Sequence, residues 1–275
     1  MPGSSKQEKP IGIFDSGVGG LTVLKALRMR LPDEHFVYLG DTARLPYGIK
    51  SPGSVLRYAR QAATHLKSRD IKLLVIACNT ASAVALADLQ RELAPLPVIG
   101  VIEPGARAAV QARPAARHLV LATEATVRLG AYGMAIREFD REASVNELPC
   151  EMLVALAEEG WTSGSIAEAI IRRYLDPQLG GATSPQSIIL GCTHFPLLRE
   201  TIASVAGGGI SIVDSAGTTA SVVARRLQDE SLHRPPGGGG RLELLATDGP
   251  RRFARVGGTF LGAGLSPEDI EVVDL

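Results

Sequence analysis

Two apolar runs that each stop at a cysteine constrain the fold of this chain more than any other feature. Residues 71–77 lead into Cys78, and residues 187–191 lead into Cys192. Small polar residues follow each cysteine: Asn79, Thr80, Thr193 and His194. A short apolar run that ends in this way is typical of a buried parallel strand, which delivers side chains to the carboxyl edge of its sheet. Two cysteines in the same position predict two related half-structures that face one site.

Strands and helices are expected to alternate along the whole chain. Residues 11–14, 35–39 and 118–122 are apolar runs of strand length, and segments with apolar residues at helical spacing follow them. One such helix is expected to run unbroken over residues 127–140. Alternation of this kind predicts mostly parallel sheets with helices on both faces, so the predicted fold class is α/β.

The length of the chain, 275 residues, accommodates two domains of ordinary size. We expect a discontinuous first α/β domain formed by residues 1–103 and 213–275. Residues 104–212 are expected to form a second α/β domain. Within these domains, residues 1–10 are polar and are expected to be a disordered leader, and residues 180–182 are expected to be a linker.

The composition disfavours several classes of protein. Hydrophobic residues make up 45% of the chain, charged residues make up 21%, and the net charge is zero, so no electrostatic signal for nucleic acid or a membrane surface is present. No segment approaches the ~18 continuous apolar residues of a membrane span, and the N-terminus lacks the apolar core of a signal peptide. We therefore expect a cytoplasmic protein that binds neither nucleic acid nor membranes. The pair Arg251–Arg252 is expected to be part of a solvated helix face.

The chain contains three cysteines and neither a CxxC nor an HExxH motif, so we expect no disulfide framework and no metal site. Cys150 lies outside the repeated pattern and is expected to be a small buried apolar residue. For Cys78 and Cys192 the pattern indicates proton exchange at a carbon stereocentre. Inversion there needs one group that removes a proton from one face and another that delivers a proton to the opposite face. A thiol with an ordinary pKa of about 8.5 suits both roles near neutral pH.

Polar side chains near the strand ends are candidates for assisting these thiols. Asp15 and Ser16 follow the first expected strand and begin the glycine-rich loop DSGVGG. The N–H groups of that loop are suited to bind either a phosphate or a substrate carboxylate, although the loop matches neither of the usual nucleotide motifs. His194, two residues after Cys192, is expected to tune or relay the proton of that thiol. Glu158, at the end of an expected helix, is either solvated or functional.

The motifs DSGVGG, CNTAS and GCTH, in this order, resemble those of the glutamate racemases, in the cofactor-independent aspartate/glutamate racemase family. The resemblance runs from Ile11 to the last expected strand at residues 270–273, and it includes YLGDTARLPYG, VIGVIEPGA, ATEATV and IVDSAGTTA. It implies an enzyme that racemises glutamate without a cofactor and supplies D-glutamate for peptidoglycan synthesis. It also implies two α/β domains related by pseudo-twofold symmetry, with the active site at their interface.

The same resemblance implies roles for individual residues. Cys78 stands at the position of the thiol that exchanges a proton with D-glutamate, and Cys192 at the position of the thiol that does so with L-glutamate. Asp15 resembles the acid that assists the first thiol, and His194 and Glu158 resemble the groups that assist the second. The implied substrate contacts are Ser16, Pro46, Tyr47, Gly48, Asn79, Thr80, Thr123, Thr126 and Thr193.

Two departures from the family pattern and three other interpretations stay open. LPCEMLVALAEEG replaces the usual CP-x-F-V-P form around Glu158, and Phe195 replaces a tyrosine. A sister cysteine racemase or isomerase acting on aspartate, hydantoins or maleate would keep both thiols. A pyridoxal-dependent enzyme is disfavoured because no lysine stands in the strand-end motifs, and a ligand-binding module would leave the two thiols unexplained. The sequence does not decide whether the chain forms a homodimer, or whether a peptidoglycan precursor or DNA gyrase contacts it.

Overall fold

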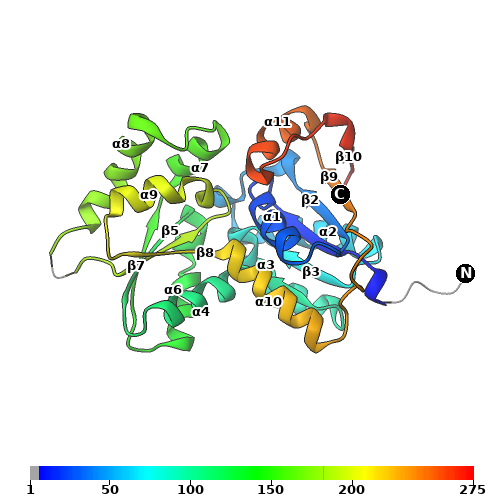
Figure 1. Ribbon diagram of the computed structural model, residues 1–275, viewed down its shortest axis with the longest axis horizontal. Helices are drawn as coiled ribbons and strands as arrows, with labels where there is room; N and C mark the ends of the chain where they lie inside the picture. Colours follow the sequence, from blue (N-terminus) through cyan, green and yellow to red (C-terminus); the bar gives the residue numbers. More distant parts are fainter. Residues whose placement is uncertain (1–5, 182) are drawn as a thin grey trace, which may run out of the picture.

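The computed structural model describes residues 6–181 and 183–275, which form two all-parallel sheets (Figure 1). The strand order is β10–β9–β2–β1–β3–β4 in the six-stranded sheet and β6–β5–β7–β8 in the four-stranded sheet. The strands are β1 (Ile11–Asp15), β2 (Phe36–Gly40), β3 (Leu73–Ile76), β4 (Val98–Gly100), β5 (Arg117–Ala122), β6 (Ser144–Pro149), β7 (Ser187–Gly191), β8 (Ser211–Asp214), β9 (Leu242–Ala246) and β10 (Ile270–Val272). The predicted α/β class with parallel sheets is confirmed. Residues 1–5 of the predicted leader and Ala182 of the predicted linker lie outside the described residues.

Helices cover both faces of each sheet. They are α1 (Leu21–Arg30), α2 (Pro52–Ser68), α3 (Asn79–Leu93), α4 (Ile102–Ala112), α5 (Glu124–Arg128), α6 (Ala131–Phe139), α7 (Glu151–Glu158), α8 (Gly164–Leu175), α9 (Arg199–Ala206), α10 (Ser215–Asp229) and α11 (Pro250–Leu261). On the six-stranded sheet, α1, α10 and α11 pack on one face and α2 and α3 on the other. On the four-stranded sheet, α7, α8 and α9 oppose α4 and α6. Within residues 6–181 and 183–275, no helix is long and apolar enough to cross a lipid bilayer.

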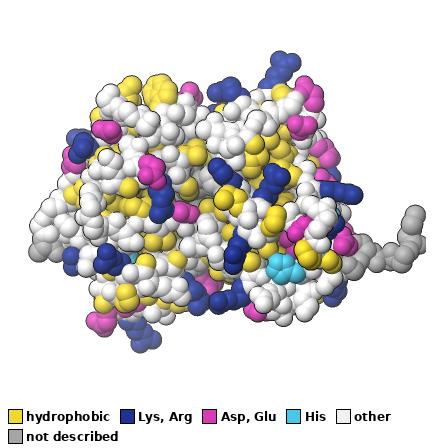
Figure 2. Space-filling view, viewed as in Figure 1, with side chains coloured by type: hydrophobic (Ala, Val, Ile, Leu, Met, Phe, Trp, Pro, Cys, Tyr) yellow, Lys and Arg dark blue, Asp and Glu magenta, His cyan; other side chains and the backbone are white. Residues whose placement is uncertain are grey.

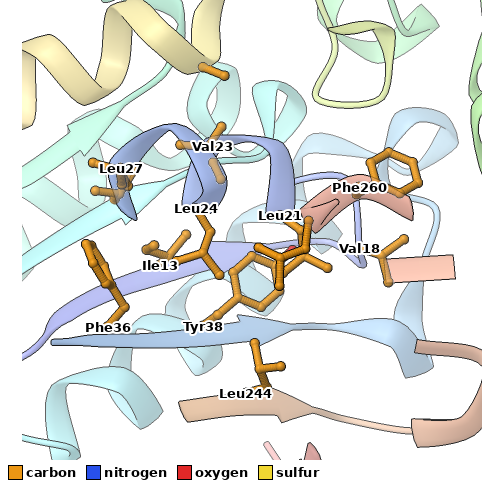
Figure 3. Close-up of a cluster of buried hydrophobic side chains, with 14 of the residues drawn as sticks. Ile13, Val18, Leu21, Val23, Leu24, Leu27, Phe36, Tyr38, Leu244 and Phe260 are labelled. Carbon is orange, nitrogen blue, oxygen red and sulfur yellow. The ribbon is translucent and has the colours of Figure 1, made fainter. Parts of the chain in front are cut away.

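The side chains of β1 alternate between two core clusters, because successive residues of a strand point to opposite faces of the sheet. Ile13 packs with Leu24 and Tyr38 in the cluster drawn in Figure 3, whereas Phe14 joins the cluster on the opposite face. Burying each such side chain completely contributes roughly 1.5–3 kcal/mol to stability. This packing fixes β1 on both faces, and its last residue, Asp15, is held at the carboxyl edge of the sheet.

We call the six-stranded sheet with its helices the first half of the molecule, and the four-stranded sheet with its helices the second half. The chain leaves the first half between β4 and α4, and it returns between β8 and α10. The division predicted after residue 103 falls in the first turn of α4, and the one predicted after residue 212 falls inside β8, which ends at Asp214. The domain boundaries stay a prediction.

Residues 6–10 of the leader that was predicted to be disordered are ordered, contrary to the prediction. Lys6–Glu8 form a 3-10 helix (η1), and the carbonyl of Gln7 accepts a hydrogen bond of 2.7 Å from the ammonium group of Lys72. The same buried ammonium group pairs with the carboxylate of Glu34. A buried charge is costly unless it is paired and hydrogen-bonded, so Lys72 holds this segment against the sheet. The sequence could not show this long-range contact.

The helix predicted over residues 127–140 is broken into α5 and α6 because Gly130 adopts a φ of +60°. Gly130→Ala is expected to lower the free energy of unfolding by about 1 kcal/mol, since an L side chain is strained in the left-handed region. The nearest atom to the added Cβ is 4.0 Å away, so the cost is conformational. Urea unfolding measures the change, with Gly53→Ala as the control.

Gly53 lies in α2, and an added Cβ there meets no atom within 4 Å. Gly53→Ala is therefore expected to raise the free energy of unfolding by about 0.5 kcal/mol. A gain of similar size for Gly130→Ala would contradict the strain assigned to that position.

Candidate active site

Cys78 and Cys192 lie at the carboxyl edges of the two sheets. Cys78 comes after β3 and is the N-cap of α3, and Cys192 follows β7 directly. The two residues are 6% and 7% exposed. A negative charge on Cys192 raises the pKa of Cys78, so the two thiols are within electrostatic reach of each other. The two halves therefore bring both thiols to one buried site.

Asp15 lies next to Cys78 because β1 and β3 are neighbours in the sheet. One carboxylate oxygen, Oδ2, accepts a hydrogen bond of 2.9 Å from the N–H of Gly17. The other oxygen, Oδ1, is buried and has no hydrogen-bond partner among residues 6–181 and 183–275. Burial raises the pKa of Asp15, while the positive charge of His194 and the loop N–H groups lower it. An unsatisfied buried acceptor of this kind is suited to receive a proton or a substrate ammonium group.

The surroundings of Cys78 favour its protonated form. Burial, and after it the charge of the Asp15 carboxylate, raise its pKa to about 12. The N–H of Ala81, 3.4 Å from the sulfur, and the hydroxyl of Ser16 act in the opposite direction. Near neutral pH, the Cys78 side chain is therefore a thiol, ready to donate a proton.

Cys192 lies at one end of a hydrogen-bonded chain that also contains His194 and Glu158. Its sulfur lies 3.7 Å from Nδ1 of His194, and Nε2 of His194 lies 3.2 Å from Oε1 of Glu158. Burial lowers the pKa of His194, but the bonds to Cys192 and Glu158 outweigh that effect and raise the pKa to about 10. The bond to His194 and the nearby Arg252 hold the pKa of Glu158 below its usual value. Near neutral pH, an imidazolium ion therefore faces the Cys192 sulfur, and a carboxylate supports that ion.

Three threonine hydroxyls from the two halves form a triangle. The Oγ1 atom of Thr80 lies 3.0 Å from that of Thr123 and 3.3 Å from that of Thr126, and the last two are 3.1 Å apart. Thr80 is in the first turn of α3, whereas Thr123 and Thr126 belong to the second half. All three residues are buried. Such a cluster of neutral donors is suited to bind a carboxylate at the boundary between the two halves.

Asn79 adds a free donor to this region. Its Oδ1 accepts a hydrogen bond of 2.8 Å from the hydroxyl of Tyr132, and this bond fixes the orientation of the amide. Its Nδ2 is buried and lacks a hydrogen-bond partner in the described part of the chain. Because Asn79 is also the first residue of α3, its amide points from a helix N-terminus, where negative charge is stabilised. A bound carboxylate would satisfy both features.

The other expected contact residues lie around the same edge. Gly48 touches the second half so closely that a Cβ there would lie 2.9 Å from Cβ of Thr123. The hydroxyl of Tyr47 donates its proton to the carboxylate of Asp41, so the donor that Tyr47 can offer to a ligand is its backbone N–H. Of the four other residues that the sequence motifs singled out, Pro46 is exposed, Ser16 is half-buried, and Thr193 and Phe195 are buried.

The glycine-rich loop after β1 holds the two halves together. A Cβ on Gly19 would lie 2.3 Å from Oγ1 of Thr193 and 2.5 Å from the ring of His194, so only glycine allows this approach. Next to it, Oγ1 of Thr22 lies 3.0 Å from the carbonyl oxygen of Thr193. The loop therefore wraps Asp15 and packs directly against the second thiol motif.

Two residues near the site are absent from the sequence-based candidates. Tyr132 lies in α6 and carries no motif, so only the three-dimensional contact with Asn79 identifies it. Arg252 was expected on a solvated face, yet its guanidinium group lies 2.7 Å from Oε2 of Glu158.

Cys150 is buried, and its thiol donates a hydrogen bond of 3.4 Å to the carbonyl of Leu148. Across residues 6–181 and 183–275, no group of three or more His, Cys, Asp or Glu residues is placed to hold a metal ion.

Comparison with known proteins gives similarity over nearly the whole chain. Residues 20–223 match the model of the Asp/Glu/Hydantoin racemase family. A glutamate racemase from Geobacter metallireducens is 48% identical over 257 residues, which cover 94% of each chain. The crystal structure of glutamate racemase from Francisella tularensis in complex with D-glutamate is 34% identical, covers 98% of both chains and has a TM-score of 0.89. The enzyme from Thermus thermophilus in complex with beta-chloro-D-alanine is 40% identical, with the same coverage and a TM-score of 0.87.

Proposed function

This chain belongs to the glutamate racemases of the Asp/Glu/hydantoin racemase family, and from that premise we propose that Cys78 and Cys192 are the two bases with which it interconverts L- and D-glutamate. As a member of this group it is a cofactor-independent isomerase. The observation that carries the assignment of the bases is the pair of buried thiols at matching strand ends. Asp15 stands beside one thiol and the His194 imidazolium beside the other. One base is thereby set to donate a proton and the other to accept one.

In the direction from L- to D-glutamate, the Cys192 thiolate removes the α-proton and becomes a thiol. The carbanion then takes a proton from the Cys78 thiol on its opposite face, which leaves a thiolate at Cys78. That protonation state is the one needed for D-glutamate. His194 with Glu158, and Asp15 with Ser16, return protons between the thiols and solvent before the next turnover in the same direction.

Charge on the substrate has to be stabilised by fixed protein groups. The donors available are Nδ2 of Asn79, the hydroxyls of Ser16 and Thr193, the threonine triangle and the N–H groups of Tyr47 and Gly48. We assign these donors to the two carboxylates of glutamate, with Pro46 at the rim, and the free Oδ1 of Asp15 to the ammonium side. Fixed donors aimed at a developing negative charge are more effective in a water-excluded site than in solution.

We place this activity in the cytoplasm, where it supplies D-glutamate for peptidoglycan synthesis. A homodimer is a hypothesis that sedimentation equilibrium tests. Neither statement affects the chemistry assigned to the two thiols.

Purified protein incubated with L-glutamate and no added cofactor is expected to bring the optical rotation to zero. The same end point is expected from D-glutamate, because the two enantiomers are equal in free energy. Aspartate serves as the control substrate and is expected to keep its rotation. Racemisation of aspartate with glutamate unchanged would move the chain to a sister activity, and no change in either amino acid would refute the proposal.

A further inference from the structure

One ion pair joins the two halves directly at the second thiol. Arg252 of α11, in the first half, lies 2.7 Å from Oε2 of Glu158, at the end of α7 in the second half. Figure 1 shows α7 and α11 facing each other across the division between the two sheets. We propose that Arg252 is a positioning residue, which holds Glu158 against His194 and makes the support of Cys192 depend on contact between the two halves. This inference rests on the proposed function, because it concerns the same thiol.

The two oxygens of Glu158 have separate partners. Oε2 binds the guanidinium group of Arg252, and Oε1 binds Nε2 of His194 at 3.2 Å. The other ring nitrogen of His194 faces the Cys192 sulfur at 3.7 Å. A carboxylate held at both oxygens has one orientation, so Arg252 fixes the distance from Glu158 to the imidazolium ion. Without it, Oε1 is free to rotate toward solvent.

A second contact from the same helix supports this arrangement. Phe260 of α11 packs edge-on against the His194 ring, with the ring centroids 5.0 Å apart. Arg252, Val256 and Phe260 are spaced by four residues, so they lie on one face of α11. That face of α11 therefore contacts both Glu158 and His194. Val256 and Phe260 are buried beneath it, whereas the side chain of Arg252 is 51% exposed.

Because Arg252 is half-exposed, its positioning role can be tested separately from any contribution to the stability of the fold. Half-exposed ion pairs contribute little to stability, so the loss of Arg252 is not expected to unfold the protein. Its effect on the site is different, because the side chain of Glu158 is only 19% exposed and its bond to His194 raises the pKa of that histidine. The charged groups that act on Glu158 are His194 and Arg252, and those that act on His194 include Cys192, Glu158 and Asp15. Weakening Glu158 is therefore expected to lower the pKa of His194.

Arg252→Gln is the test, with Arg252→Lys as the conservative variant and Arg251→Gln as the matched control. Arg251 is the preceding residue on α11, is exposed and makes no ion pair within the described residues. Arg252→Gln is expected to lower kcat about 10-fold with little change in KM, which is less than the roughly 10²–10⁴-fold contribution of a general acid or base, because Arg252 acts only through Glu158 and His194. The alkaline limb of the kcat–pH profile is expected to move to lower pH, because the imidazolium ion is lost earlier. Arg252→Lys is expected to restore most of both effects, and Arg251→Gln to match the native enzyme.

A measurement without substrate keeps this inference separate from the racemase activity. In a Cys78→Ser, Cys150→Ala background, the pH dependence of alkylation of Cys192 by iodoacetamide is expected to change on Arg252→Gln and not on Arg251→Gln. If the native enzyme left glutamate unchanged while alkylation responded in this way, the proposed function would fail and the positioning role would stand. Native kcat, pH profile and alkylation in Arg252→Gln, or equal losses in Arg251→Gln, would overturn the positioning role.

Discussion

Replacing either Cys78 or Cys192 by serine is expected to lower kcat/KM for racemisation by about 10³-fold or more, in both directions. Each thiol acts on one face of the same carbon, so the loss of either one interrupts the only path between the enantiomers. A serine hydroxyl is too weak an acid to replace a thiol in this exchange. Because the equilibrium constant of a racemisation is unity, the losses measured from L- and D-glutamate must be equal. Circular dichroism at several substrate concentrations gives both values.

The third cysteine provides the control. Cys150 is buried in the apolar cluster of the second half and lies outside the proton path, so Cys150→Ala is expected to keep kcat/KM within about threefold of the native value. The double variant Cys78→Ser/Cys192→Ser is expected to be no slower than the single variants, since residues that act as a unit have non-additive effects. Near-native activity in either single variant would show that one base is sufficient and would exclude the two-base scheme.

The sequence predicted those parts of the fold that depend on local patterns. Buried parallel strands such as β1 and β7 are short apolar runs, and their carboxyl ends carry the polar residues that meet at the sheet edge. The break at Gly130 could not be predicted in the same way, because a single glycine is tolerated inside a helical pattern. The ordered segment from Lys6 was also missed, since a long-range contact with the buried Lys72 ammonium group fixes it.

The candidate site shows the same division between local and long-range information. The strand-end motifs placed Asp15, Cys78 and Cys192 at the sheet edges without reference to coordinates. The link from Glu158 to His194 required the structure, because it joins the end of α7 to the loop after β7. Arg252 was assigned to a solvated face because an arginine pair looks the same in the sequence whether it forms a surface ion pair or a contact between the two halves. The roles of all these residues stay predictions until variants are measured.

Asp15→Asn is expected to lower kcat about 10²-fold and, at the same time, to make Cys78 more reactive toward alkylation. Racemisation slows while alkylation becomes faster, because the Asp15 carboxylate acts on Cys78 in two ways. It offers the free Oδ1 acceptor through which protons reach Cys78, and its charge raises the pKa of that thiol after burial has already raised it. An asparagine removes the charge, so the pKa of Cys78 falls and more thiolate is present at a given pH, yet the proton acceptor is lost.

Alkylation is best measured in a Cys150→Ala, Cys192→Ser background, where Cys78 is the only remaining one of the three cysteines. In that background, Asp15→Asn is expected to move the pH midpoint of iodoacetamide alkylation to lower pH, and in the native background the same substitution is expected to slow racemisation. Ser16→Ala is the matched comparison, because the hydroxyl of Ser16 lowers the pKa of Cys78 and its loss should move the midpoint to higher pH. If Asp15→Asn slowed both alkylation and racemisation, the carboxylate would act by shaping the site, and its assignment as the proton partner of Cys78 would be wrong.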